Sequence, residues 1–260
     1  MPILEIPHSQ PCSSCGSGLD IHSWMLSDDL GGKGQEFVLV HGLGMSSRYM
    51  LPTARLLTSH GTVHVPDLPG FGRSGKPRRT FSIAELSDVL GEWMAARGIE
   101  LPVLIGNSLG GQVIADFAAR NRGRLRYAVL VAPTVDPDAR RVGTQFLRLL
   151  MDLPREPLAL YGIGLADYAK AGWPRIIETL HSALTHPVRE LMTQILCPVL
   201  LVRGACDPIV PQSWMEEAAH LIPVAELVVI AKAAHAVNFD DPAGLVEVIV
   251  NFLTSRESHA

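Results

Sequence analysis

One serine of the chain lies between two glycines in a segment that could present a nucleophile, Gly106-Asn-Ser108-Leu-Gly110. An apolar run at 103–105 precedes it and a helix-like stretch follows it, which is the context of a nucleophile elbow. In such a turn, side chains two residues before and after the serine would collide. The hydroxyl is raised above the sheet at a helix N-terminus, where amides favour negative charge. The pattern predicts that Ser108 is a nucleophile; the alternative is a glycine-rich turn with an idle serine.

Attack of a serine on a carbonyl creates an oxyanion, which fixed hydrogen-bond donors must stabilise. The backbone amide of Leu109, next to the serine, is our first candidate donor. The second is the backbone amide of Leu43, in the segment His41-Gly-Leu-Gly44 that directly follows the apolar run 37–40. We interpret His41 as a structural residue that holds this loop, and not as the catalytic base.

A serine hydroxyl is a weak nucleophile at neutral pH and needs a neighbouring base. The chain has ten histidines, so position must distinguish them. His235 follows the last apolar run, 227–230, and precedes the last helical stretch. Asp207 lies in the loop after the run 199–202 and is predicted to orient the histidine. Asp136, a few residues after the run 127–131, is the rival acid.

The elements that must position these residues alternate between strand-like and helix-like runs, which predicts an α/β fold with a mostly parallel central sheet covered by helices. The predicted buried strands are 37–40, 63–65, 103–105, 127–131, 199–202 and 227–230, and the clearest helices are 83–97, 110–120 and 242–253. Residues 1–36 resemble an antiparallel hairpin, with 19–25 as its second strand and 31–34 as a turn. Asp240 and Asp241 are expected to cap the final helix.

Residues 135–193 interrupt this alternation with apolar residues at helical spacing and with prolines at 154, 157, 174 and 187. We predict a helical cap here, inserted into a core domain formed by 1–134 and 194–260. The alternative is a set of ordinary sheet-covering helices. The apolar residues of a cap are expected to face the sheet domain or the substrate and not the solvent, which would give a mostly apolar pocket over Ser108. The predicted substrate-binding residues are Phe146, Tyr161, Tyr168 and Trp173.

Five segments in order resemble the α/β-hydrolase superfamily, in its capped, esterase-like and meta-cleavage-product-hydrolase-like branch. They are His41-Gly-Leu-Gly44, Asp67-Leu-Pro-Gly70-Phe-Gly-Arg-Ser74, Gly106-Asn-Ser108-Leu-Gly110, Gly204-Ala-Cys-Asp207 and Ala234-His235. The resemblance runs from about residue 19 to the last helix and implies a triad in the chain order Ser, Asp, His. The family usually has a glycine shortly before the histidine, where this chain has Lys232-Ala-Ala-His235. Many carbon–carbon-bond hydrolases of the branch have a tryptophan after it, where this chain has Ala236.

The resemblance implies a serine hydrolase that cleaves a carboxylic ester, thioester or lactone of a small hydrophobic substrate. Carbon–carbon hydrolysis of meta-cleavage type stays an alternative, as does a non-hydrolytic catalyst such as a lyase, cofactor-free oxygenase or acyltransferase, because this fold supports many reactions. A receptor-like, ligand-binding module without catalytic activity is the fourth function that we consider. A serine at the elbow argues against haloalkane dehalogenases and epoxide hydrolases, which use an aspartate there.

The composition restricts partners and location. A net charge of −4 over 260 residues gives no basic footprint for nucleic acid or an anionic membrane. No apolar run approaches a membrane span and no signal peptide is apparent, so we expect a cytoplasmic protein with a small-molecule substrate. The oligomeric state stays open, a homodimer included. We expect no cofactor and no metal: Cys12 and Cys15 lack a second pair of ligands, and their role stays open, while Cys197 and Cys206 are interpreted as core residues.

Overall fold

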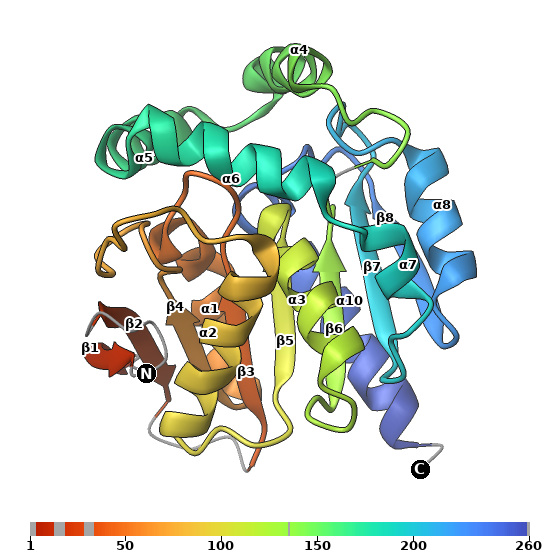
Figure 1. Ribbon diagram of the computed structural model, residues 1–260. Helices are drawn as coiled ribbons and strands as arrows, with labels where there is room; N and C mark the ends of the chain where they lie inside the picture. The colour runs from red at the N-terminus through yellow and green to blue at the C-terminus, as the bar shows by residue number, and fades with distance from the viewer. Residues whose placement is uncertain (1–3, 13–18, 29–33, 135, 259–260) are drawn as a thin grey trace.

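The computed structural model describes residues 4–12, 19–28, 34–134 and 136–258, and eight of its strands form one sheet in the order β1-β2-β4-β3-β5-β6-β7-β8 (Figure 1). The strands are β1 (Leu4–Cys12), β2 (Leu19–Ser27), β3 (Glu36–Val40), β4 (Thr62–Pro66), β5 (Val103–Asn107), β6 (Tyr127–Val131), β7 (Val199–Gly204) and β8 (Ala225–Ile230). The six strands β4, β3, β5, β6, β7 and β8 are mutually parallel. Strand β2 runs antiparallel to both of its neighbours, β1 and β4. The predicted fold class and N-terminal hairpin are confirmed. Of the predicted turn, residues 31–33 lie outside the described ranges.

Alternate residues of the parallel strands enter two separate cores. In β3, Phe37 and Leu39 face one core while Val38 and Val40 face the other, and all four are fully buried. A strand that is covered on both faces must be apolar at every position, which is why these strands read as short unbroken apolar runs.

Helices cover both faces of the sheet. One face is covered by α1 (Leu51–Leu57), α9 (Val237–Asp240) and α10 (Pro242–Glu257), and the other by α2 (Ile83–Ala96), α3 (Leu109–Arg120), α7 (Val188–Met192) and α8 (Gln212–Leu221). The short 3-10 turns η1 (Ser47–Met50) and η2 (Thr58–His60) flank α1. The Asp241 side chain caps α10 by accepting the Gly244 N–H at 3.0 Å, as predicted. Asp240 does not cap it, because its carboxylate accepts the Ala234 N–H.

The chain between β6 and β7 forms α4 (Val142–Asp152), η3 (Leu153–Arg155), α5 (Leu158–Ala171), α6 (Trp173–Thr185) and α7. In Figure 1, α4, α5 and α6 lie across the top of the sheet, above the carboxyl ends of the parallel strands, whereas α7 packs beside α3 and α8. We call α4 to α6 the insertion. That it acts as a separate cap, with the boundaries 135–193, stays a prediction.

The insertion does not shield its apolar side chains as the sequence led us to expect. Phe146 is 58% exposed, Trp173 is 66% exposed and Tyr161 is exposed, whereas Tyr168 is half-buried. In Figure 1 these helices lie above the sheet with no further layer outside them, so one side of each faces away from the core. The expectation of buried side chains is wrong for Phe146, Tyr161 and Trp173, although their role toward substrate stays a prediction.

Candidate active site

Ser108 occupies a sharp turn between β5 and α3 with φ 57° and ψ −119°, a conformation that residues with a side chain rarely adopt. Two glycines make this turn possible. A Cβ on Gly106 would lie 2.5 Å from the carbonyl carbon of Gly110, and a Cβ on Gly110 would lie 2.2 Å from the carbonyl oxygen of Val40. The Ser108 N–H donates to the Val131 carbonyl at 2.9 Å, which fixes the turn to β6. Only glycine fits at positions 106 and 110 of this turn, and the turn puts Ser108 at the N-terminus of α3.

His235 and Asp207 form a buried pair at the ends of neighbouring strands. The His235 Nδ1–H donates to Asp207 Oδ2 at 2.9 Å, and Asp207 Oδ1 accepts the backbone N–H groups of Ile209 and Val210 at 2.7 and 3.0 Å. Burial opposes the charge on Asp207, but the charge and hydrogen bond of His235 and the two amides lower its pKa. The carboxylate is thus held ionised and aimed at the imidazole.

In the turn before His235, this chain has Lys232 close to where the family that it resembles usually has a glycine. Lys232 has φ 68°, a region that favours glycine. A Cβ on Gly204, at the end of β7, would lie 2.1 Å from the Ala234 carbonyl oxygen, so this glycine lets the turn approach β7 closely.

Asn107, the residue before Ser108, connects the nucleophile turn to the histidine loop. Its Nδ2 donates to the His235 carbonyl at 3.0 Å, and its Oδ1 accepts the Tyr49 hydroxyl at 2.8 Å. The Tyr49 hydroxyl in turn accepts the Gly42 N–H at 2.7 Å. Among the described residues, no hydrogen bond joins Ser108 Oγ to His235 itself. The chain of three bonds nevertheless links the loops that carry the nucleophile, the histidine and Leu43.

The loop 41–44 lies directly against the nucleophile. A Cβ on Gly42 would be 3.3 Å from the Ser108 Cβ. The two ring nitrogens of His41 both have backbone partners: Nε2 accepts the Leu68 N–H at 2.9 Å, and Nδ1 therefore carries the proton that it donates to the Gly42 carbonyl. Burial lowers the pKa of His41, so the ring is neutral. His41 is occupied in holding the loop and has no nitrogen left for a serine.

Of the two predicted oxyanion donors, Leu109 follows Ser108 at the start of α3, and Leu43 follows Gly42 in the loop that lies against Ser108. The backbone N–H of Leu43 and that of Leu109 donate no hydrogen bond to any described residue. Leu109 is the first residue of α3, where helix geometry leaves amides without internal partners. That the two N–H groups stabilise an oxyanion at Ser108 stays a prediction.

Two acidic residues of the insertion reach the histidine loop, and no local sequence pattern indicates that they would lie there. Glu156 Oε1 accepts the Ala236 N–H at 2.8 Å, and Asp152, at the end of α4, is buried nearby. Burial raises the pKa of Glu156 to about 7, with a contribution from the charge of Asp152. Burial would lower the pKa of His235, but the charges of Asp207, Asp152 and Glu156 outweigh it and raise that pKa to about 9.

The insertion is also attached to the loop that follows Leu43. Asp167 of α5 is buried, and its carboxylate accepts the Ser46 hydroxyl at 2.6 Å and the Arg48 guanidinium at 2.5 Å. The next residue, Tyr168, covers Gly44, since a Cβ there would lie 2.6 Å from its ring. Of the four predicted substrate-binding residues, Tyr168 alone is thus in contact with the loop beside Ser108 in the interactions described.

The remaining candidates lie elsewhere. Asp136 accepts hydrogen bonds from the Arg148 guanidinium at 3.0 Å and from the Asp138 N–H, and among the described residues no hydrogen bond or ion pair joins it to His235. Cys12 ends β1, while its side chain and the whole of Cys15 lie outside the described part of the chain. The expectation that Cys206 is a core residue is wrong, because it is exposed; Cys197 is half-buried. Within the described ranges, no group of three metal-ligating side chains gathers, and no helix is long and apolar enough to cross a bilayer.

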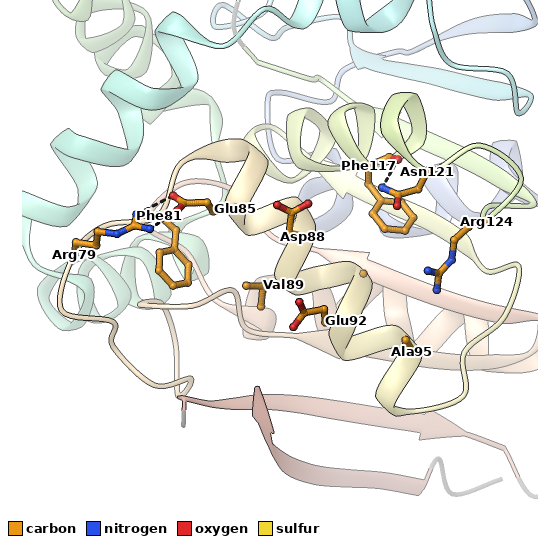
Figure 2. A pocket seen from close by; sticks show the side chains of 11 residues that line it. Arg79, Phe81, Glu85, Asp88, Val89, Glu92, Ala95, Phe117, Asn121 and Arg124 are labelled. Atoms are coloured by element: carbon orange, nitrogen blue, oxygen red, sulfur yellow. Dashed lines mark hydrogen bonds and ion pairs between the residues drawn. The ribbon is translucent and has the colours of Figure 1, made fainter. Parts of the chain in front are cut away.

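A pocket of about 470 Å³ lies between the outer sides of α2 and α3, on a flank of the molecule (Figure 2). Arg79 and Glu85, which form an ion pair at its edge, line it together with Phe81, Asp88 and Phe117. None of the proposed catalytic residues lines this pocket. Its size alone therefore gives no reason to place substrate there.

The chain belongs to the alpha/beta hydrolase family, whose model matches residues 37–248. This range includes Ser108, Asp207 and His235, and the mostly parallel sheet agrees with the fold class that the sequence predicted.

Proteins of known type resemble the chain over nearly its whole length. A pimeloyl-[acyl-carrier protein] methyl ester esterase of Vibrio cholerae is 26% identical, over 89% of this chain and 97% of its own. The solved structure of a thermophilic esterase from Thermogutta terrifontis is 25% identical and superposes with a TM-score of 0.77, over 97% of this chain and 98% of its own. The 2-hydroxy-6-oxo-6-phenylhexa-2,4-dienoate hydrolase of a Rhodococcus strain shares the fold, at 20% identity, a TM-score of 0.74 and coverage of 97% and 100%.

Proposed function

We propose that this protein is a serine hydrolase that cleaves a carboxylic ester, thioester or lactone of a small, mostly hydrophobic substrate through an acyl-enzyme. The observation that carries the proposal is the buried His235–Asp207 pair on a loop bonded to Asn107, the neighbour of a serine in a strained elbow. Strained backbone that its surroundings enforce is concentrated at functional sites.

In the proposed acylation step, His235 Nε2 takes the proton of the Ser108 hydroxyl while Oγ attacks the carbonyl carbon of the substrate. The carbonyl oxygen becomes an oxyanion, to which the N–H groups of Leu43 and Leu109 donate. The imidazolium then gives its proton to the departing alcohol or thiol as the bond to carbon breaks. Asp207 fixes the Nδ1–H tautomer, so that Nε2 faces the serine.

In the proposed deacylation step, a water molecule replaces the alcohol. His235 removes a proton from it, the hydroxide adds to the acyl carbon, and the same two amides stabilise the second oxyanion. Collapse returns the proton to Ser108 Oγ and releases the carboxylic acid. No group beyond the side chains and the two amides is required.

Ester cleavage is favoured over carbon–carbon cleavage on two grounds. Two of the similar proteins named above are esterases. Ala236 follows His235 in place of the tryptophan that many carbon–carbon hydrolases of the branch carry, and its N–H donates to Glu156.

A fluorophosphonate probe tests the proposal directly, because it labels only an activated serine. Wild-type protein should be labelled at Ser108, as peptide mass spectrometry would establish, and Ser108→Ala should not be labelled. Product analysis on ester, thioester, lactone and diketone substrates then identifies the bond cleaved. Unlabelled wild-type protein that is folded would contradict the proposal.

A further inference from the structure

Helix α4 has its polar side turned inward and its apolar side turned outward. Gln145 and Asp152 are buried, and Arg148, at a position between them on the same side, is half-buried and pairs with Asp136. At 100° per residue, the opposite side of the helix carries large apolar residues, and these are exposed: Phe146, Leu147, Leu150 and Met151. A surface helix of a globular protein normally has the reverse arrangement. This one presents an apolar side to whatever lies outside the molecule.

The same exposure continues on the neighbouring helices. Leu158 and Leu165, two turns apart on α5, are 88% and 76% exposed, and Trp173 and Ile177, one turn apart on α6, are also exposed. The helices α4 and α5 both contact α6, and in Figure 1 the three lie along one edge of the molecule. Exposed apolar residues that gather on one region mark an interaction surface. We call the exposed residues of α4 to α6 the outer face of the insertion.

The charges of this segment are distributed in the same one-sided way. Between residues 140 and 185, which cover α4 to α6 and the two residues before α4, the acidic side chains Asp152, Glu156 and Asp167 are buried or half-buried, and Glu178 is exposed. Four of the six cationic side chains are exposed, namely Arg140, Arg141, Arg155 and Lys170. The exposed charge of the segment is therefore positive, although the whole chain carries −4. The average over the chain conceals a local basic region.

A partner for the outer face must accept both apolar side chains and cations. A second copy of the chain, docked through the same face about a two-fold axis, would bring the same cations together. An anionic lipid surface matches both features, because apolar side chains enter the boundary between headgroups and acyl chains while Arg and Lys pair with the headgroups. We propose that the outer face of the insertion docks the protein peripherally on anionic lipid surfaces.

Vesicle sedimentation tests this proposal without reference to the reaction catalysed. Wild-type protein should co-sediment with vesicles made of equal parts phosphatidylcholine and phosphatidylglycerol, and much less with vesicles of phosphatidylcholine alone. Added salt should weaken the binding, since the attraction of surface cations to anionic lipid is screened.

Two double variants separate the apolar and basic contributions. Leu158→Ser with Leu165→Ser should lower partitioning to the anionic vesicles by at least about tenfold, because two exposed leucines no longer enter the lipid. Arg140→Gln with Arg141→Gln should lower it by roughly 10- to 30-fold, since each cation near the surface contributes about 1 kcal/mol. Leu56→Ser, an exposed leucine on α1 away from the insertion, is the matched control and should bind as wild type. Unchanged melting temperatures would establish that the variants are folded.

Three outcomes would overturn the proposal. The first is the absence of co-sedimentation with either vesicle by the folded wild-type protein. The second is equal binding to both vesicle types that the arginine variant does not reduce. The third is a dimer in sedimentation equilibrium that the leucine variant dissociates, with no vesicle binding, which would assign the outer face to a second copy.

Discussion

Ser108 is held in a backbone conformation that costs on the order of 1–3 kcal/mol for a residue with a side chain. The neighbouring residues hold Ser108 in this conformation: Gly106 and Gly110 allow close backbone contacts, and the hydrogen bond to the Val131 carbonyl fixes the turn. Neither glycine can be replaced without moving backbone atoms of β3 or α3. The motif was readable from the sequence because sterics at so tight a turn leave few residue types that fit.

Replacing Ser108 by alanine should remove the nucleophile and little else. The Cβ is retained, and the Ser108 side chain takes part in no described hydrogen bond, so the melting temperature should stay close to that of the wild type. We expect kcat for ester hydrolysis to fall by at least roughly 10³-fold. Steady-state kinetics and thermal unfolding measure the two effects. Turnover near the wild-type level would rule out a covalent mechanism through Ser108.

Asp207→Asn and Asp136→Asn form a matched pair, since both remove one buried carboxylate after a parallel strand. Asp207 contacts His235 at 2.9 Å and Asp136 contacts Arg148 at 3.0 Å. Asn at 207 can donate to Nδ1 and so stabilise the wrong tautomer. We expect a loss of roughly 10²- to 10⁴-fold in kcat for Asp207→Asn with little change in KM, and less than about tenfold for Asp136→Asn. Kinetics of both variants on one ester decide the matter, and the reverse ranking would transfer the role to Asp136.

At the scale of elements, the site depends on loops that meet at the carboxyl edge of the sheet. Tyr49, Asn107 and the His235 loop are joined by hydrogen bonds between residues as far apart as 128 positions along the chain. Apolar periodicity predicted the strands and helices that aim these loops, and positions after strands predicted that Asp207 and His235 would pair. The catalytic roles assigned to them and to Ser108 stay predictions. Contacts made by Tyr49 or Glu156 were not predictable, because they depend on how separate loops pack and leave no local pattern.

Glu156→Gln should change how the site responds to pH. Glu156 titrates near pH 7, so above that pH its negative charge helps to hold the pKa of His235 near 9. A protonated His235 cannot accept the serine proton. Neutralising Glu156 therefore lowers the pKa of His235 and increases the active, neutral fraction between pH 7 and 9. We expect the acid limb of the kcat/KM profile to move to lower pH, while Gln keeps an oxygen for the Ala236 N–H.

Glu178→Gln is the control for this pH profile, because Glu178 is an exposed acid on α6. Its profile should coincide with that of the wild type, since solvent screens an exposed charge. A Glu156→Gln profile that is unchanged or displaced to higher pH would show that Glu156 does not hold the pKa of His235 high.

At the scale of the whole molecule, composition describes averages and the fold decides where each residue goes. The apolar content of residues 135–193 suggested shielded side chains, yet Phe146 and Trp173 are exposed while the acids Asp152 and Asp167 are buried. Periodicity shows that a helix has two unlike sides. It does not show which side faces inward. Here the sheet domain offers Arg48 and the His235 loop as hydrogen-bond partners for acids of the insertion, so these acidic residues face inward. The burial of polar groups here follows from those specific bonds.

An acyl-length series tests whether the insertion bounds the substrate site. Tyr168 covers Gly44 beside the proposed oxyanion loop, so an acyl chain bound at Ser108 should meet apolar surface there. Each methylene buried should improve kcat/KM by about fourfold, from roughly 0.8 kcal/mol per group, until the space is filled. We expect p-nitrophenyl esters of increasing length to rise to an optimum and then fall, and uncharged acyl groups to exceed charged ones. Tyr168→Ala should displace the optimum, whereas Leu158→Ala, at a position of α5 that is 88% exposed, should leave it in place. A flat series, or a preference for charged acyl groups, would show that α4 to α6 do not enclose the acyl group.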